Sequence, residues 1–169
     1  PSPAALPRRD RAARRTLNQR ESEMPIINIR FIKDVVATEE QKERFLRPLA
    51  AGRIRSAFLM TEPDGGAGSD PSMLATTARQ VGGDWVISGR KWLITGARGA
   101  TFGIVMARTG ESATMFLVDM STPGIVVERV LNTIDESMPG GHGIVRLDDV
   151  RVPASQILGE AHEWFRYAQ

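Results

Sequence analysis

A series of short β-rich runs, separated by glycine and proline turns, fills residues 54–159 and constrains the fold more than any other feature of the chain. Valine, isoleucine and aromatic residues favour strands, whereas Gly82-Gly83-Asp84, Ser88-Gly89 and Thr122-Pro123-Gly124 are typical of turns. The predicted strands cover residues 58–60, 74–81, 85–87, 92–95, 103–107, 115–119, 125–130 and 144–147. Strands at this spacing predict a mainly β domain, built as a sandwich or a barrel.

One helix is predicted before the first strand. Residues 38–41 read Thr-Glu-Glu-Gln, a capping box in which the first and last side chains bind each other's backbone amides. Pro48 is expected to kink this helix and Gly52 to end it. A second helix is predicted to begin at Ala161 and to be cut by the end of the chain.

The charge of the chain is unevenly distributed. Residues 1–23 carry six arginines against three acidic residues, a net charge of +3, whereas the whole chain has a net charge of +2. This leader has no aromatic residue, although surfaces that bind nucleic acid combine basic and aromatic side chains, so no nucleic-acid partner is predicted. Its arginines are compatible with a transit peptide, but its three prolines disfavour an amphipathic helix, and Met24 is a candidate initiator.

Composition excludes several further classes of function. The chain has no cysteine, which excludes disulfides, thiol catalysis and thiolate metal sites. Its two histidines, His142 and His162, are far apart in the sequence, so no metal site is predicted. No apolar run reaches the roughly 20 residues of a membrane span, and no transmembrane segment is predicted.

A glycine-rich loop follows the first predicted strand. Pro63 must end that strand because it lacks a backbone donor, and Gly65, Gly66 and Gly68 lack the Cβ that would keep a ligand away from the backbone. Hydroxyls and a carboxylate lie at the two ends of the loop, in Thr61, Ser69 and Asp70. Taken alone, such a loop is either a plain turn or a cradle for a flat or anionic ligand.

Several blocks in a fixed order resemble the acyl-CoA dehydrogenase flavoproteins. The blocks are residues 38–49, Thr-Glu-Pro at 61–63 with Gly-Ser-Asp at 68–70, residues 84–91, Ile-Thr at 94–95, residues 116–118, 122–124, 147–153 and 157–159. Met-Thr-Glu-Pro at 60–63 and the glycine-rich segment 137–143 are similar to the subgroup around family members ten and eleven.

The resemblance implies a division of the chain. Residues 1–37 would be an arginine-rich leader with a poorly assigned segment, and residues 38–53 a remnant of the family's N-terminal helical domain. Residues 54–159 would form the middle β-domain, a β-barrel or sandwich, and residues 160–169 the start of a C-terminal helical domain.

The resemblance also implies an FAD site. Backbone and hydroxyl groups from the first strand and the glycine loop would hold the isoalloxazine ring and the pyrophosphate, and the strand around residue 94 would cover the ring and place a hydroxyl near its reactive nitrogen. The cofactor-binding residues are then Phe58, Met60, Thr61, Gly68, Ser69, Leu93 and Thr95. Ser69 and His142 are candidates for contact with substrate, although His142 fits a surface loop as well.

Two departures from the family pattern concern this site. Two extra residues lengthen the loop within 64–67. Leu93 stands where the family has an aromatic residue that faces the flavin, and Trp92 precedes it. Neighbouring residues of a strand point to opposite faces, so Trp92 is predicted to be a core residue and not a replacement.

By resemblance, the function would be FAD-dependent α,β-dehydrogenation of an acyl-CoA thioester, with an electron-transfer flavoprotein as acceptor and a homo-oligomeric enzyme. The family's base is a glutamate of the C-terminal helical domain, so no catalytic residue is assigned in this chain, and Glu62 is expected to be structural. The alternative is a non-catalytic β-barrel that serves as a binding or interaction module. The expected location is the bacterial cytoplasm, or the mitochondrion if the source is eukaryotic.

Overall fold

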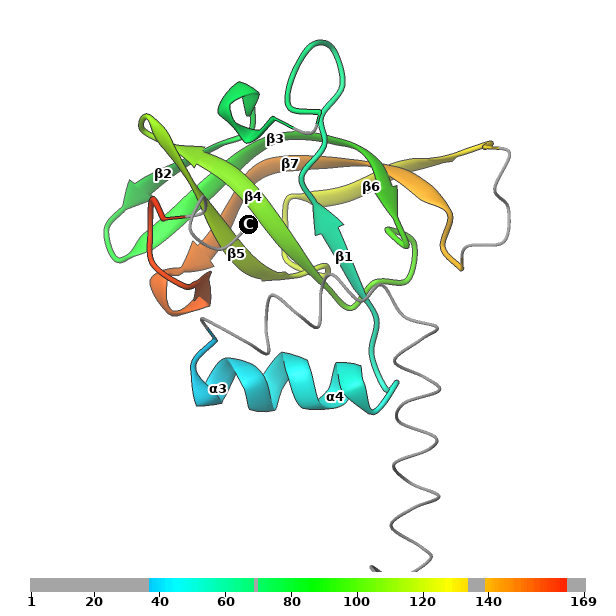
Figure 1. Ribbon diagram of the computed structural model, residues 1–169, viewed down its shortest axis with the longest axis horizontal. Coiled ribbons are helices and arrows are strands. Elements are labelled where there is room, and N and C mark those ends of the chain that lie inside the picture. Colours follow the sequence, from blue (N-terminus) through cyan, green and yellow to red (C-terminus); the bar gives the residue numbers. More distant parts are fainter. Residues whose placement is uncertain (1–36, 69, 134–138, 164–169) are drawn as a thin grey trace, which may run out of the picture.

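One strongly curved sheet of eight strands dominates the protein (Figure 1). The computed structural model describes residues 37–68, 70–133 and 139–163. Its strands are β1 (Ser56–Leu59), β2 (Thr77–Val81), β3 (Asp84–Thr95), β4 (Phe102–Thr109), β5 (Ser112–Asp119), β6 (Ile125–Leu131), β7 (His142–Pro153) and β8 (Ile157–Leu158). The prediction of a mainly β domain with one helix before it is confirmed.

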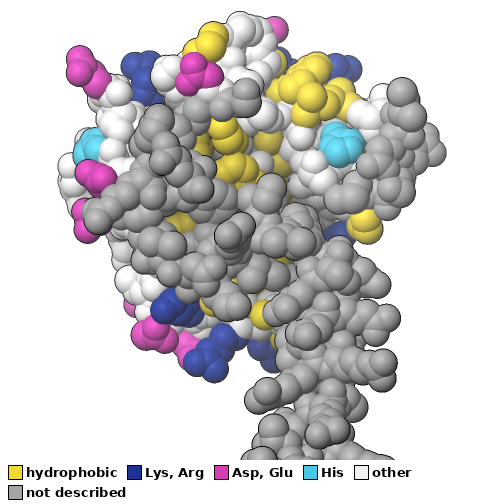
Figure 2. Space-filling model, viewed as in Figure 1, with side chains coloured by type: hydrophobic (Ala, Val, Ile, Leu, Met, Phe, Trp, Pro, Cys, Tyr) yellow, Lys and Arg dark blue, Asp and Glu magenta, His cyan; other side chains and the backbone are white. Residues whose placement is uncertain are grey.

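On the face shown in Figure 2, charged side chains lie mostly around the edge and hydrophobic side chains are visible between them. Within the described part of the chain, no helix has both the length and the apolar character needed to cross a membrane.

The sheet consists of two halves joined at a narrow hinge. Its strand order is β6-β7-β3-β2-β4-β5-β8, with β1 beside β4, so the path has two ends and the sheet is open. Most pairs are antiparallel, but β1 and β2 both run parallel to β4, and β2 meets β4 only through Thr77 and Arg108. The half β6-β7-β3-β2 can therefore bend over the half β1-β4-β5-β8.

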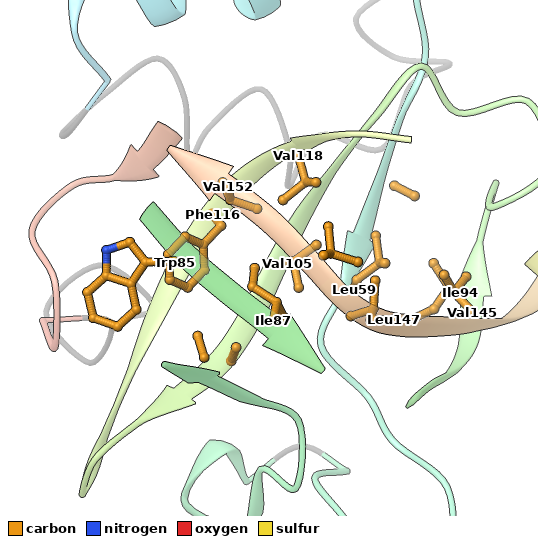
Figure 3. Packing of buried hydrophobic residues seen from close by; sticks show 14 of the residues in the cluster. Leu59, Trp85, Ile87, Ile94, Val105, Phe116, Val118, Val145, Leu147 and Val152 are labelled. Carbon is orange, nitrogen blue, oxygen red and sulfur yellow. The ribbon is translucent and has the colours of Figure 1, made fainter. Parts of the chain in front are cut away.

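The first core fills the space between these halves (Figure 3). Trp85 and Ile87 of β3 lie toward Phe116 of β5 and Val105 of β4, and the Trp85 and Phe116 ring centroids are 5.6 Å apart. Leu59 of β1 lies toward Leu147 of β7 at the other end of the same core. Apolar burial across the two halves stabilises the bend that the narrow hinge permits.

A second core lies on the outer face of β4 and β5, beneath the helix. α3 (Glu39–Gln41), a π-helical turn (Lys42–Leu46) and α4 (Arg47–Ala50) follow one another without a break. Phe45 and Leu49 of this helix are buried, and the ring centroids of Phe45 and Phe102 are 4.8 Å apart. Because both faces of β4 are covered, this strand is apolar without alternation, as expected of a strand buried on both sides.

The predicted limits of the helix are confirmed. The Thr38 side chain accepts a hydrogen bond from the Gln41 amide at 3.2 Å, and the Gln41 side chain accepts one from the Thr38 amide at 3.1 Å. Gly52 ends the helix with a φ of 67°. Pro48, which was predicted to kink the helix, lies in α4, and the irregularity in the helix is the π-helical turn just before Arg47.

Gln41 also anchors the helix to the end of the domain. Its side-chain amide donates to the carbonyls of Ser155 and Ile157, both at 2.8 Å. The capping residue therefore ties the first described element to the last strand, β8.

The predicted turn at Ser88-Gly89 is wrong. β3 continues through it from Asp84 to Thr95, paired with β7 on one edge and with β2 on the other. A Cβ on Gly89 would lie 2.7 Å from the Cα of Thr76, so glycine is required here for the close approach of another segment and not for a turn.

The limits of two other strands differ less from the predicted ones. β2 begins at Thr77 and not at residue 74, and β7 is longer than predicted at both ends. The predicted leader lies outside the described residues except for Ala37, as do residues 164–169 of the predicted second helix.

Candidate functional site

The end of β1 and the middle of β3 are tied together at the candidate site. Thr61, just after β1, donates from its hydroxyl to the Trp92 carbonyl at 2.5 Å, and the Trp92 amide donates to the Thr61 carbonyl at 2.8 Å. The single proton of this hydroxyl is used inside the protein, so Thr61 can offer a bound group only its oxygen lone pairs.

A bulge in β3 turns two neighbouring side chains away from the core. Lys91 is paired with Val145 and Ile94 with Gly143, so Trp92 and Leu93 together stand opposite Ile144. Lys91 and Ile94 both point inward and are buried, and the extra residue between them breaks the alternation. Leu93 adopts a left-handed φ of 54° and is 45% exposed.

The bulge overturns the prediction made for Trp92. This side chain is half-buried and belongs to neither hydrophobic core, so the prediction of a core residue is wrong. The rule that neighbours on a strand face opposite sides holds only for regular pairing, and the bulge removes that regularity.

Thr95 and His142 meet across the β3–β7 ladder. They are direct partners in register, and the Thr95 hydroxyl oxygen lies 3.0 Å from Nδ1 of His142. The Gly96 amide donates to the Gly141 carbonyl at 2.7 Å, which fixes the approach of the two chain segments. Two residues 47 positions apart are thereby joined, although the predicted contact of His142 with substrate stays a prediction.

A buried ion pair lies behind the site. The side chains of Lys91 and Glu62 are 0% and 1% exposed, and Lys91 Nζ donates to Glu62 Oε1 at 2.8 Å. The same ammonium group donates to the carbonyls of Met60 at 3.1 Å and Met106 at 2.7 Å. Lys91 therefore links β3 to the end of β1 and to β4.

Glu62 holds the far side of the glycine loop. Its two carboxylate oxygens accept from the backbone amides of Ala75 at 2.6 Å and Thr76 at 2.9 Å. These contacts agree with the structural role expected for Glu62, because a carboxylate saturated with buried donors has no access to a substrate proton.

Opposing effects act on the two buried groups. Burial by itself would raise the pKa of Glu62, but the Lys91 ammonium and the hydrogen bonds from Lys91, Ala75 and Thr76 outweigh it and hold that pKa below its ordinary value. Burial lowers the pKa of Lys91 to about 8, against the opposing attraction of the Glu62 carboxylate.

The glycines of the loop differ in how closely other atoms pack against them. A Cβ on Gly66 would lie 2.7 Å from the Glu62 carboxylate, so this glycine is needed for packing. A Cβ on Gly65 or Gly68 would meet no described atom within 4 Å, so the loop is open on that side. Ser69 lies outside the described residues, and the role predicted for it remains a prediction.

The described residues fit a flat, uncharged ring bound beside a strand end. Leu93 supplies an exposed apolar surface, Thr95 a hydroxyl, Thr61 an acceptor and the open glycines a place for close backbone approach. β1 pairs with β4 alone among the described strands, so strand pairing does not occupy its other edge. No group of three or more acidic or histidine side chains in the described part is arranged to hold a metal ion.

Sequence reasoning missed the Lys91–Glu62 pair and the bulge. A signal for the pair was present, because Lys91 directly precedes an apolar run and Glu62 closely follows another, and two charges that become buried are expected to pair. The bulge had no comparable local signal, since Leu93 is not a residue that favours a positive φ.

Comparison with known proteins identifies the class. A family model described as "Acyl-CoA dehydrogenase, middle domain" matches residues 57–150. This is more than half of the chain and includes nearly all of β1, all of β2 to β6 and most of β7. The chain belongs to the acyl-CoA dehydrogenase family, of which it contains the middle domain.

Individual relatives agree with this assignment. The chain is 43% identical over 141 residues to mouse acyl-CoA dehydrogenase family member 10, a match that covers 78% of this chain and 13% of the relative. It is 43% identical over 136 residues to chicken acyl-CoA dehydrogenase family member 11, a match that covers 73% of this chain and 17% of the relative. The predicted likeness to the subgroup around members ten and eleven is confirmed.

A solved structure with a bound flavin has the same fold. Glutaryl-CoA dehydrogenase from Mycobacterium smegmatis, solved in complex with FADH2, superposes with a TM-score of 0.72 at 35% identity. The match covers 80% of this chain and 34% of that structure. The chain thus spans about a third or less of the length of these relatives.

Proposed function

We propose that this chain is the flavin- and substrate-contacting middle domain of an FAD-dependent acyl-CoA dehydrogenase. The observation that carries the proposal is the convergence of Thr61, Leu93 and Thr95 around the bulge of β3, in a chain that belongs to this family. The resemblance of the sequence to the family implies the same three residues as cofactor-binding.

In the proposed complex, FAD supplies an acceptor for the hydride that leaves the β-carbon of the acyl-CoA. Leu93 covers one face of the ring and excludes water there. Thr95 places its hydroxyl at the reactive ring nitrogen, and Thr61 accepts a hydrogen bond with its lone pairs. The open side of the loop at Gly65 and Gly68 receives the pyrophosphate, with Ser69 as a further donor.

The proton from the α-carbon requires a base outside the described residues. Glu62 is ruled out by its burial against Lys91, and we propose a carboxylate from a helical domain beyond this chain. Contact of His142 with the acyl chain, transfer of electrons to a partner flavoprotein, assembly into a homo-oligomer and a cytoplasmic or mitochondrial location belong to the same proposal.

The proposal is tested by titrating the purified chain with FAD and measuring the flavin fluorescence and absorbance. Saturable binding is expected, and Thr95→Val is expected to weaken it about 5- to 10-fold through loss of one hydrogen bond. Thr77→Val, on an exposed position of β2, is the matched control and should bind as the wild type does. Binding that Thr95→Val leaves unchanged would contradict the proposed site.

A non-catalytic binding module remains the second candidate. The observation that favours it is Leu93, because a leucine covers a ring with less contact area than an aromatic residue. Leu93→Trp separates the two candidates. It should strengthen FAD binding if the site is a flavin site, whereas no binding of FAD by either chain would favour the module.

A further inference from the structure

The hydroxyl of Thr95 has a limited hydrogen-bonding capacity. It carries one proton and two lone pairs, and one of its positions is taken by His142 at 3.0 Å. A neutral imidazole presents at Nδ1 either a proton or a lone pair, depending on its tautomer. The state of His142 therefore decides what Thr95 can offer to anything bound beside it.

Two arrangements follow. When Nδ1 of His142 carries a proton, it donates to the Thr95 oxygen, and the Thr95 proton is available to a ligand acceptor. When Nδ1 is bare, it accepts the Thr95 proton, and Thr95 presents only a lone pair to the ligand. To change from one arrangement to the other, the imidazole loses a proton from one ring nitrogen to solvent and gains one on the other. The Thr95 hydroxyl also rotates, and no other bond is made or broken.

These two arrangements match the two redox states of the proposed cofactor. The reactive ring nitrogen is a hydrogen-bond acceptor in oxidised FAD and an N–H donor in reduced FAD. If Nδ1 kept its proton in both states, the Thr95 oxygen would accept two hydrogen bonds when FAD is reduced, and its own proton would have no partner at this site. A change of tautomer at His142 lets the hydroxyl use its proton in both states.

We infer that His142 is a positioning residue that sets the direction of the Thr95 hydrogen bond, so that the site accepts both oxidised and reduced FAD. The inference rests on the proposed function. The geometry favours it because the β3–β7 register holds Thr95 and His142 opposite each other, and the Gly96–Gly141 hydrogen bond fixes the same segments.

The direct test follows the imidazole of His142 in the full chain by ¹⁵N NMR at pH 8. Oxidised FAD is expected to favour the tautomer with a proton on Nδ1, and reduced FAD the tautomer with a bare Nδ1. Thr95→Val should abolish this difference, because the link between ring and imidazole is then lost. The same tautomer with both forms of FAD would overturn the inference.

A second test measures whether His142 acts through Thr95. His142→Phe is expected to weaken binding of both forms of FAD about 5-fold, the effect of losing one hydrogen bond. The double variant with Thr95→Val should bind no more weakly than Thr95→Val alone, because the two changes remove the same interaction. His142→Asn, whose amide can donate or accept at the Nδ1 position, should restore binding.

The outcomes separate the two proposals. If the wild type binds neither form of FAD, the proposed function and the inference both fail. If the wild type binds both forms and His142→Phe binds equally well, or if the double variant shows additive losses, only the role of His142 is overturned. A comparison of thermal midpoints identifies any variant that has lost its fold.

Discussion

At the scale of single residues, the most demanding feature is the charged pair Lys91–Glu62 in an apolar interior. Removing two charges from water is costly, and here the cost is offset by mutual attraction together with five backbone partners. The pair connects β1, β3, β4 and the segment after the glycine loop, so its value lies in fixing the relative position of elements that form the candidate site.

Glu62→Gln should be strongly destabilising. It leaves the Lys91 ammonium buried without its counter-charge, which costs about 3–5 kcal/mol in comparable cases. Chemical denaturation measures the loss. Glu43→Gln is the matched control, since Glu43 pairs with Arg47 on the exposed helix surface and its loss should cost less than about 0.5 kcal/mol. Equal effects of the two substitutions would contradict the role given to the pair.

The same pair predicts a dependence of stability on acid. The pKa of Glu62 is lower in the folded than in the unfolded protein, so the unfolded chain binds more protons, and stability falls as the pH drops below the unfolded value of 4.5. The difference in unfolding free energy between wild type and Glu62→Gln should be smaller at pH 3 than at pH 7, because protonation of Glu62 removes the same charge as the substitution. Denaturation curves between pH 7 and pH 3 measure it, and a constant difference would show that the Glu62 pKa is not lowered.

At the scale of elements, β3 decides the geometry of the site. It runs unbroken through a predicted turn and then breaks its own alternation further along, between Lys91 and Ile94. The register of the β3–β7 pairing shifts twice. It shifts between Ile87 and Gly89, where Thr76 packs against Gly89, and again at the bulge, where Trp92 and Leu93 turn outward together. The single strand thus packs the core at one end and presents candidate ligand-binding side chains at the other.

Gly89→Ala tests the packing role of this glycine. The added methyl group would lie 2.7 Å from the Thr76 Cα and should cost about 1–3 kcal/mol through overpacking. Gly83→Ala is the control, because a Cβ there meets no described atom within 4 Å, and it should change stability by less than about 0.5 kcal/mol. Thermal or denaturant unfolding compares the stability of the two variants. Equal losses of stability would contradict the packing role given to Gly89.

At the scale of the whole molecule, two cores share the same pair of central strands. Val105 and Phe116 face the inner core, whereas Ile104, Met115 and the helix residue Phe45 belong to the outer one. Loss of either core therefore removes support from one face of β4 and β5, and the domain is expected to unfold as one unit.

Phe45→Ala tests this coupling. Truncation of this buried ring should destabilise the domain by about 3–5 kcal/mol. Amide exchange in β7, on the opposite half of the sheet, should accelerate by the same factor as exchange in β5, because the two halves open together. Faster exchange confined to the helix and β5 would show that the outer core opens independently.

The sequence alone was sufficient for the β architecture, the helix limits and the family. The first two depend on local signals: β-branched runs bounded by turn residues, the capping box formed by Thr38 and Gln41, and Gly52 at the end of the helix. The residues proposed to bind FAD followed from the order of family motifs, because those motifs lie in short contiguous blocks.

Only the tertiary structure decided which side chains face the site and what holds them there. The bulge that turns Trp92 outward is set by the pairing of β3 with β7, and the partner of Thr95 lies 47 residues away. The burial of Lys91 against Glu62 depends on three strands closing around it. Such features arise from contacts between distant segments, whose free energies exceed local preferences and leave little trace in any one stretch of sequence.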